Sequence, residues 1–301
     1  MIETTDGVKL RVELVADGLD RPADLAVAPD GRLFVAERSG RIRIVRDARV
    51  PPAAAWSLAE AAAGPGQVLA LALDPQFEQN RFVFAIYTAP SREGEPRFSL
   101  ARFREVSDTL ADRVVLLDEV RASHGDAAAS LRFGPDGKLY AAFDDGGEPR
   151  LAGDLASPNG KLLRLNADGS TPGDQAGGTP LYSYAYRSPS GLDWDPSSGA
   201  WGIADRETMT SARLSAVVPG HGSRPGETHG VVRGSYALPS TTSPSSVAFY
   251  RGRQSSALSG NLLIASDEGR HLVGGVRAVA VSPEGAIYFA TARAIGRLVS
   301  D

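Results

Sequence analysis

The chain has 301 residues, with 32 Lys and Arg against 36 Asp and Glu, a net charge of −4 and no cysteine. This composition excludes disulfides and thiolate metal sites, and no basic cluster indicates a nucleic-acid partner. No apolar run is long enough to cross a membrane. The length allows a large core and no stretch resembles a linker, so we predict a single domain spanning residues 1–301.

The N-terminal residues Met1–Gly7 are polar and do not resemble a secretory signal peptide. From the residues alone we expect either a cytoplasmic protein or one whose signal peptide has been removed. A first strand is predicted at Val8–Leu14, where apolar and polar side chains alternate with a period of two.

A cassette of apolar strand, tight turn and second apolar strand then recurs along the chain. Its first copy is Leu25–Val35, which is built around the turn Pro29-Asp30-Gly31. Proline fixes φ and glycine supplies a flexible corner, so such turns join adjacent antiparallel strands. The later turns lie at Leu73-Asp74-Pro75, Gly134-Pro135-Asp136-Gly137, Trp194-Asp195-Pro196, Tyr250-Arg251-Gly252 and Ser282-Pro283-Glu284-Gly285. Six cassettes at this spacing predict an all-β, six-bladed β-propeller.

The two ends of the chain are expected to share one blade. The N-terminal strand has no nearby partner in sequence, and the last cassette ends in another strand at Ile295–Val299. Pairing these strands closes the ring and removes an exposed sheet edge. The Ala-rich stretch 53–63 is expected to form a short helix between blades, and 220–246 is expected to form long loops over the central channel.

Several segments in this order resemble one known family. They are Gly18-Leu19 with Glu37–Ile42, Leu69–Phe77, Asn80–Val83, Leu131–Tyr140, Asp154–Pro172 and Tyr186–Leu192. Over nearly its whole length the chain resembles the soluble glucose/sorbosone (aldose sugar) dehydrogenases. The resemblance implies a six-bladed propeller that uses pyrroloquinoline quinone (PQQ) and calcium (Ca²⁺). It also implies a periplasmic or secreted location.

The resemblance places a catalytic histidine five residues before Leu131, where this chain has Asp126. In the family that histidine takes the substrate hydroxyl proton. An aspartate can act as a general base if it is well positioned, and His124 lies two residues earlier. Asp126 and His124 are therefore the candidate catalytic residues. The alternative is that Asp126 is a solvated loop carboxylate in a protein that has lost the reaction.

The resemblance implies that Arg187, Arg277 and Gln67 contact the cofactor. PQQ carries three carboxylates and favours surrounding cations. A family lysine is replaced at Asp267-Glu268 and a second arginine near Arg277 is missing, so a degenerate active site with weakened PQQ binding is expected. Candidate replacement cations in the loops are Arg206, Arg213, Arg224, His221 and His229.

Carboxylates accumulate at the starts of the predicted inner strands. Asp24 opens the first, Asp145 matches a family aspartate, and Asp205 stands at a family glutamate position. If these starts converge on the channel, the three aspartates form a candidate site for Ca²⁺ or another hard divalent cation. The alternative is that they cap loops by accepting backbone hydrogen bonds.

Three functions follow from these patterns. The first is a divergent PQQ-dependent dehydrogenase of a sugar or alcohol, with altered or lost activity. The second is a non-catalytic propeller that binds a sugar or a protein. The third is a divalent-metal-dependent hydrolase of lactones or phosphotriesters, because metal-bound water can attack such esters.

Overall fold

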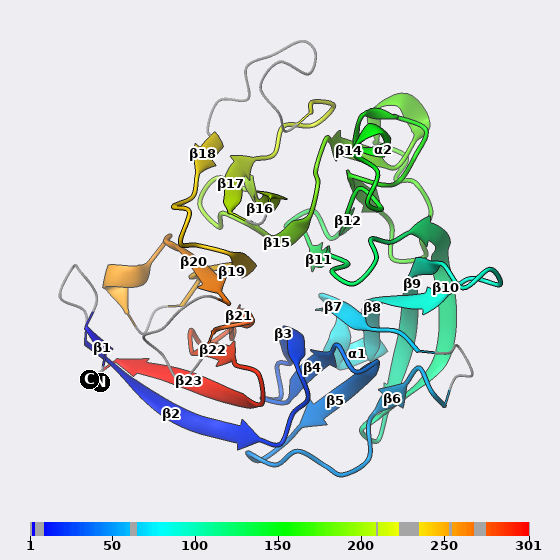
Figure 1. The fold of residues 1–301 in the computed structure, drawn as a ribbon. Coiled ribbons are helices and arrows are strands. Elements are labelled where there is room, and N and C mark those ends of the chain that lie inside the picture. Colours follow the sequence, from blue (N-terminus) through cyan, green and yellow to red (C-terminus); the bar gives the residue numbers. More distant parts are fainter. Residues whose placement is uncertain are drawn as a thin grey trace.

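The computed structural model describes residues 2–3, 9–60, 65–208, 210–222, 235–252, 255–267 and 275–300. In this part of the chain the strands form six antiparallel sheets, which are arranged around a central axis (Figure 1). Four sheets have four strands, one has five, and β19–β20 has two described strands. The predicted six-bladed propeller is therefore confirmed.

From the axis outward, the blades are β3 (Pro22–Val27), β4 (Leu33–Glu37), β5 (Arg41–Val45), β6 (Trp56–Ser57); β7 (Val68–Leu73), β8 (Phe82–Pro90), β9 (Pro96–Val106), β10 (Thr109–Arg121); β11 (Ala129–Phe133), β12 (Leu139–Phe143), β13 (Lys161–Leu165), β14 (Leu181–Tyr184); β15 (Pro189–Trp194), β16 (Trp201–Thr208), β17 (Ser211–Ala216), β18 (Ser235–Ala237); β19 (Pro244–Phe249), β20 (Leu262–Ser266); and β21 (Ala278–Val281), β22 (Ile287–Ala290), β23 (Ala294–Ser300), β2 (Lys9–Asp17), β1 (Ile2–Glu3). Four short helices interrupt them: α1 (Phe77–Asn80), α2 (Pro149–Gly153), η1 (Ala176–Gly178) and η2 (Ser256–Leu258).

The innermost strands form a closed ring. Strands β3, β7, β11, β15, β19 and β21 contact one another in that order, and β21 contacts β3 again. The ring is completed within the last blade, where β2 from the N-terminus pairs antiparallel with β23 from the C-terminus. This pairing confirms the predicted closure by the two ends of the chain, which lie together in Figure 1.

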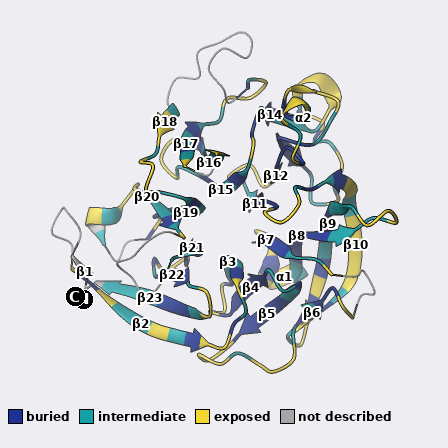
Figure 2. Cartoon of the chain, viewed as in Figure 1, coloured by how far each residue is buried: buried dark blue, intermediate teal, exposed yellow. Residues whose placement is uncertain are grey.

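The apolar core lies between the blades. Each of the five buried clusters joins two neighbouring sheets, and the buried positions follow the inner strands in Figure 2. Between β15 and β19 the backbones approach closely: a Cβ at Gly191 would lie 2.7 Å from the amide nitrogen of Val247. Burial of apolar side chains from both neighbours is what holds one blade against the next.

The turns follow the sequence prediction. Gly31 and Gly137 have φ of 83° and 69°, the left-handed region that glycine enters without steric cost. The helix expected at 53–63 is wrong for the part that is described, because Trp56–Ser57 pair with β5 as the outer strand of the first blade. The ring of Trp56 packs 5.0 Å from that of Phe103, and this tertiary contact outweighs the helix preference of alanine.

Of the stretch 220–246, residues 223–234 lie outside the described residues. The remainder corrects the expectation of continuous loop, because it includes β18 and the first residues of β19. Among the described residues no helix is long and apolar enough to cross a membrane.

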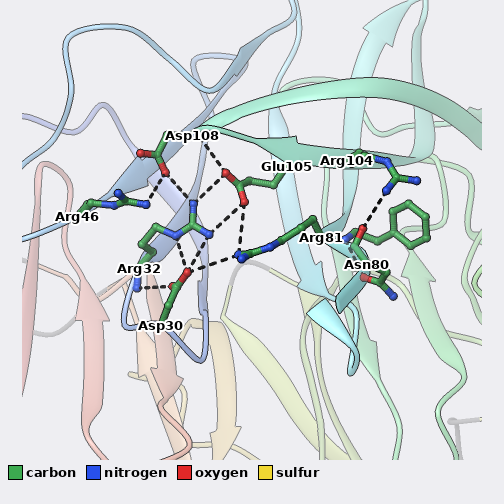
Figure 3. Close-up of polar contacts among 9 residues, drawn as sticks. Asp30, Arg32, Arg46, Asn80, Arg81, Arg104, Glu105 and Asp108 are labelled. Atoms are coloured by element: carbon green, nitrogen blue, oxygen red, sulfur yellow. Dashed lines mark hydrogen bonds and ion pairs between the residues drawn. The ribbon is translucent and has the colours of Figure 1, made fainter. Parts of the chain in front are cut away.

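An ionic network ties the first blade to the second (Figure 3). The buried guanidinium of Arg32 lies 2.7 Å from Asp108, 3.0 Å from Glu105 and 2.9 Å from Asp30. Arg81 adds longer contacts of 3.7 Å to Asp30 and Glu105. Glu105 is as buried as Arg32, so neither charge is stable there without the other.

Candidate functional site

A cavity of about 290 Å³ opens where the inner strands begin. Its wall comes from the first residues of β3, β11, β15 and β19, from Arg277 just before β21, and from the loop before β11. Small-molecule sites commonly occupy such concave places and start at about 300 Å³. The propeller therefore brings side chains that are far apart in sequence to one small pocket.

Arginines outnumber carboxylates among the residues that line this cavity. The arginines are Arg21, Arg38, Arg132, Arg206 and Arg277, and the carboxylates are Asp24, Asp126 and Asp267. Each aspartate forms an ion pair with one arginine. Asp24 lies 2.8 Å from Arg132, Asp126 lies 2.7 Å from Arg206, and Asp267 lies 3.4 Å from Arg277. Arg21 in turn lies 3.6 Å from Asp20, which is not among the lining residues, so one positive charge remains without a carboxylate partner among the described residues of the lining. A cavity of this kind attracts anions.

Arg38 is the lining arginine without a carboxylate neighbour. Its Nη1 donates to the side-chain oxygen of Gln67 at 2.8 Å, and among the described residues no carboxylate lies within ion-pair distance of its guanidinium. Burial lowers the pKa of Arg38, the charges of the arginines around it lower it further, and Asp126 opposes them. A half-buried cation in this position would be stabilised by an anionic ligand.

Arg21 has an unusual backbone conformation. Its φ is 52°, in the left-handed region, and its carbonyl accepts a hydrogen bond from the amide of Arg38. A non-glycine residue here costs on the order of 1 kcal/mol, and such costs concentrate at functional sites. The strained turn brings Arg21 to the cavity rim next to Arg38.

Asp126 reaches the cavity but His124 does not. The carboxylate of Asp126 is mostly exposed and accepts a hydrogen bond from Nη2 of Arg206, which also donates to Ser188. His124 is exposed and contacts Glu95 at 2.7 Å, outside the residues that line the cavity. Of the two candidate catalytic residues, the structure places Asp126 alone at the site.

The loop that carries Asp126 is held by a buried carboxylate. Asp144 accepts backbone hydrogen bonds from Ser123 at one end of the loop and Ala128 at the other, and a third from Gly146. Burial raises the pKa of Asp144 to about 7, although these hydrogen bonds oppose the shift. The loop is therefore fixed at both ends, with Asp126 between them.

Comparison with known proteins identifies the family. Residues 19–204 match the model of the Glucose / Sorbosone dehydrogenase family, which is more than half of the chain. The chain belongs to the glucose/sorbosone dehydrogenase family. Aldose sugar dehydrogenase YliI of Escherichia coli K12 is 28% identical over 204 residues, 64% of this chain and 55% of that protein. Quinoprotein glucose dehydrogenase B of Acinetobacter calcoaceticus is 27% identical over 219 residues, 61% and 46% of the two chains.

Solved structures show the same fold over nearly the whole chain. A putative oxidoreductase (glucose dehydrogenase) from Thermus thermophilus is 30% identical with a TM-score of 0.79, covering 97% of this chain and 100% of that one. The apo aldose sugar dehydrogenase of E. coli has a TM-score of 0.81 at 22% identity, covers 97% of this chain and 100% of that one, and shows the fold alone. The chain spans about half the length of the curated relatives it matches.

The cofactor residues expected for this glucose/sorbosone dehydrogenase family member are only partly at the cavity. Arg277 lines it and Gln67 supports Arg38, but Arg187 is exposed and outside the lining.

The candidate replacement cations are also divided. Arg206 lines the cavity, whereas Arg213 pairs with Glu207 elsewhere. Nδ1 of His221 lies 2.9 Å from the Pro219 carbonyl oxygen in its own loop, away from the lining residues. Arg224 and His229 lie outside the described residues.

The three aspartates predicted to bind a metal do not converge. Asp24 lines the cavity and accepts hydrogen bonds from both terminal guanidinium nitrogens of Arg132, at 2.8 and 3.0 Å. Asp205 accepts the amides of Arg187 and Ser188, and Asp145 accepts the amide of Gly147. Within the described ranges, no group of three or more His, Asp or Glu side chains could hold a metal ion.

Sequence reasoning missed three charged residues of the site. Arg21 stands directly before β3, as the predicted Arg277 stands directly before β21, so comparison of equivalent positions between blades would have indicated Arg21. Arg38 lies inside a segment that resembles the family, but nothing in the sequence shows that it faces the channel. Arg132 gave no signal, because its partner Asp24 is 108 residues away.

Proposed function

We propose that this chain is a PQQ-dependent dehydrogenase of a sugar or alcohol, with its site in the arginine-lined cavity. The observation that carries the proposal is the excess of arginine over carboxylate at this cavity. PQQ has three carboxylates, and guanidinium groups recognise carboxylates with paired, charge-assisted hydrogen bonds. The names of the E. coli and Acinetobacter relatives, an aldose sugar dehydrogenase and a quinoprotein, support the same activity.

The residues present fit the charge of this cofactor. Arg38, Arg206 and Arg277 would hold its carboxylates, and Gln67 would orient Arg38. When bound, PQQ supplies the two-electron acceptor that oxidises the carbon carrying the substrate hydroxyl. For Ca²⁺ the side chains of the described residues offer no fitting set, so we assign it no ligand.

Asp126 is the residue we assign to proton transfer. It stands at the cavity edge with one oxygen on Arg206 and most of its surface exposed, so a substrate hydroxyl can reach the carboxylate. A general base contributes roughly 10²- to 10⁴-fold to a rate. The small cavity favours a sugar or simple alcohol over a polymer.

The test is a screen of sugars and alcohols with PQQ-loaded protein and an electron-accepting dye. We expect turnover that falls at least about a hundredfold in Asp126→Asn, whereas His124→Gln keeps it. Turnover that survives in Asp126→Asn would show that another group takes the proton. No turnover with any sugar or alcohol, despite bound PQQ, would contradict a dehydrogenase of this substrate class.

One observation favours a second function, an anion-binding propeller without catalysis. One oxygen of the Asp126 carboxylate accepts a hydrogen bond from Arg206, which leaves less of the carboxylate open to a substrate hydroxyl. Such a protein would bind a carboxylate ligand and show no turnover. The metal-dependent hydrolase requires a ligand cluster that the described residues do not form, so we do not propose it.

A further inference from the structure

The two exposed carboxylates of the cavity both occupy arginines. Asp126 contacts Nη2 of Arg206 at 2.7 Å, and Asp267 contacts Nε of Arg277 at 3.4 Å. Half or more of each carboxylate surface is exposed, whereas both arginines are largely covered. Ion pairs with one exposed partner are weak, because water solvates that partner almost as well when the pair is broken.

We propose that Asp126 and Asp267 are internal placeholders, which the carboxylates of a small polycarboxylate ligand displace from Arg206 and Arg277. The proposal deepens the proposed function, because it describes how the same cavity takes its anionic ligand. Unlike that function, it does not require PQQ: any di- or tricarboxylate of suitable size should compete with the two aspartates for Arg206 and Arg277.

The structure indicates which partner of the first pair moves. Arg206 lies in β16, its amide donates to the Ser188 carbonyl, and its guanidinium also donates to the Ser188 hydroxyl. Asp126 lies in the middle of a loop whose ends are held by Asp144. The arginine is therefore fixed and the aspartate is the group that turns away.

The exchange has a consequence for proton transfer. While Asp126 contacts Arg206, one oxygen of its carboxylate accepts a hydrogen bond from the guanidinium. Once a ligand carboxylate takes over Arg206, both oxygens of Asp126 are free to contact a substrate hydroxyl. Binding of the anionic ligand thus prepares the base that the proposed reaction needs.

The test measures carboxylate binding in variants that remove one placeholder. Citrate, a tricarboxylate, is titrated by calorimetry at low salt into the wild type, Asp126→Asn and Arg206→Gln. We expect Asp126→Asn to bind citrate about five- to tenfold more tightly, since it frees an arginine and removes a negative charge, and Arg206→Gln to bind more weakly. Glu207→Gln is the matched control, because it removes an equal charge from the pair with Arg213 outside the cavity.

Three outcomes would overturn the proposal: affinity in Asp126→Asn no higher than in the wild type, an equal gain in Glu207→Gln, or no citrate binding in any variant at about 10 mM. A repeat with PQQ separates this proposal from the proposed function. If Asp126→Asn binds citrate more tightly and PQQ does not bind, the placeholder proposal is supported and the proposed dehydrogenase function is contradicted. If PQQ binds but Asp126→Asn binds neither ligand more tightly than the wild type does, the dehydrogenase function remains supported and the placeholder proposal is contradicted.

Discussion

The pair of Asp24 and Arg132 on the cavity floor gives the sharpest test of how this site is built. Asp24 is almost fully buried and accepts four hydrogen bonds, two from Arg132 and one each from the amides of Leu25 and Leu71. The pair thereby joins the inner strands β3, β7 and β11. Replacing Asp24 with alanine would leave two buried amides without their acceptor and Arg132 without its carboxylate, with only the carbonyls of Leu71 and Leu131 as acceptors among the described residues.

The expected cost of Asp24→Ala is about 3 kcal/mol. Removing one partner from a buried ion pair costs about 3–5 kcal/mol, and the lower end applies because Arg132 also borders the cavity and can gain water. For a chain of this size the loss lowers Tm by roughly 6 °C. Arg132→Met should cost less, because Asp24 keeps two amide donors. The double variant should be more stable than the sum of both losses predicts.

Urea unfolding of the three variants measures these free energies, and EDTA separates the pair from a metal site at Asp24. We expect EDTA to leave the stability of the wild type unchanged and the cycle to show coupling of about 1 kcal/mol or more. A cost below about 1 kcal/mol for Asp24→Ala, or strictly additive losses, would refute the importance of the pair. A loss with EDTA equal to that of Asp24→Ala would instead support the metal site.

Three further predictions concern stability. Arg32→Met should cost about 3 kcal/mol of stability and make stability depend less on pH below pH 4.5. Burial raises the pKa of Glu105, but Arg32 and the other groups around it lower it by more, so Glu105 stabilises the fold above its ordinary pKa of 4.5 and loses this effect as the pH falls through the lowered pKa. Parallel acid-unfolding curves for both proteins would refute this. Asp144→Asn should cost more stability at pH 5 than at pH 8 in urea unfolding. Burial raises the pKa of Asp144 to about 7, above its unfolded value of 3.8, so the wild type loses stability as the pH rises from 3.8 to about 7. A cost of the substitution that does not depend on pH would contradict this prediction. Gly191→Ala should lower Tm by a few degrees at a cost of about 1–3 kcal/mol, because its Cβ would press on the backbone of Val247, and an unchanged Tm would show that the two strands can separate.

The fold could be predicted because its signals are local. Turn residues such as Gly31 need only their own neighbours, and closure by the chain ends follows from two unpaired strands. One exception was the stretch 53–63, where the rings packed around Trp56 decide the structure and composition does not show them. The other was 220–246, where β18 and the start of β19 stand in a segment whose composition favours loops.

The site was predictable only where the resemblance to a known family assigned a role to a position in the chain. The resemblance predicted Asp126 at the position of the family histidine, five residues before Leu131, and Arg277 at the position of a family arginine before the last cassette, and both line the cavity. The cation excess was missed, because facing residues such as Arg38 and Arg206 come from different blades. The aspartates were expected to gather, yet Asp24 faces an arginine that the sequence places 108 residues away.

The central claim is that the arginine-lined cavity binds PQQ, and calorimetric titration of PQQ with and without Ca²⁺ tests it most directly. We predict a Kd of about 1 µM or tighter for the wild type in the presence of Ca²⁺, at least about tenfold weaker binding in Arg38→Gln and Arg277→Gln, and no change in Arg213→Gln, whose arginine lies outside the cavity. No binding at about 100 µM PQQ, or equal binding in all four proteins, would contradict the claim.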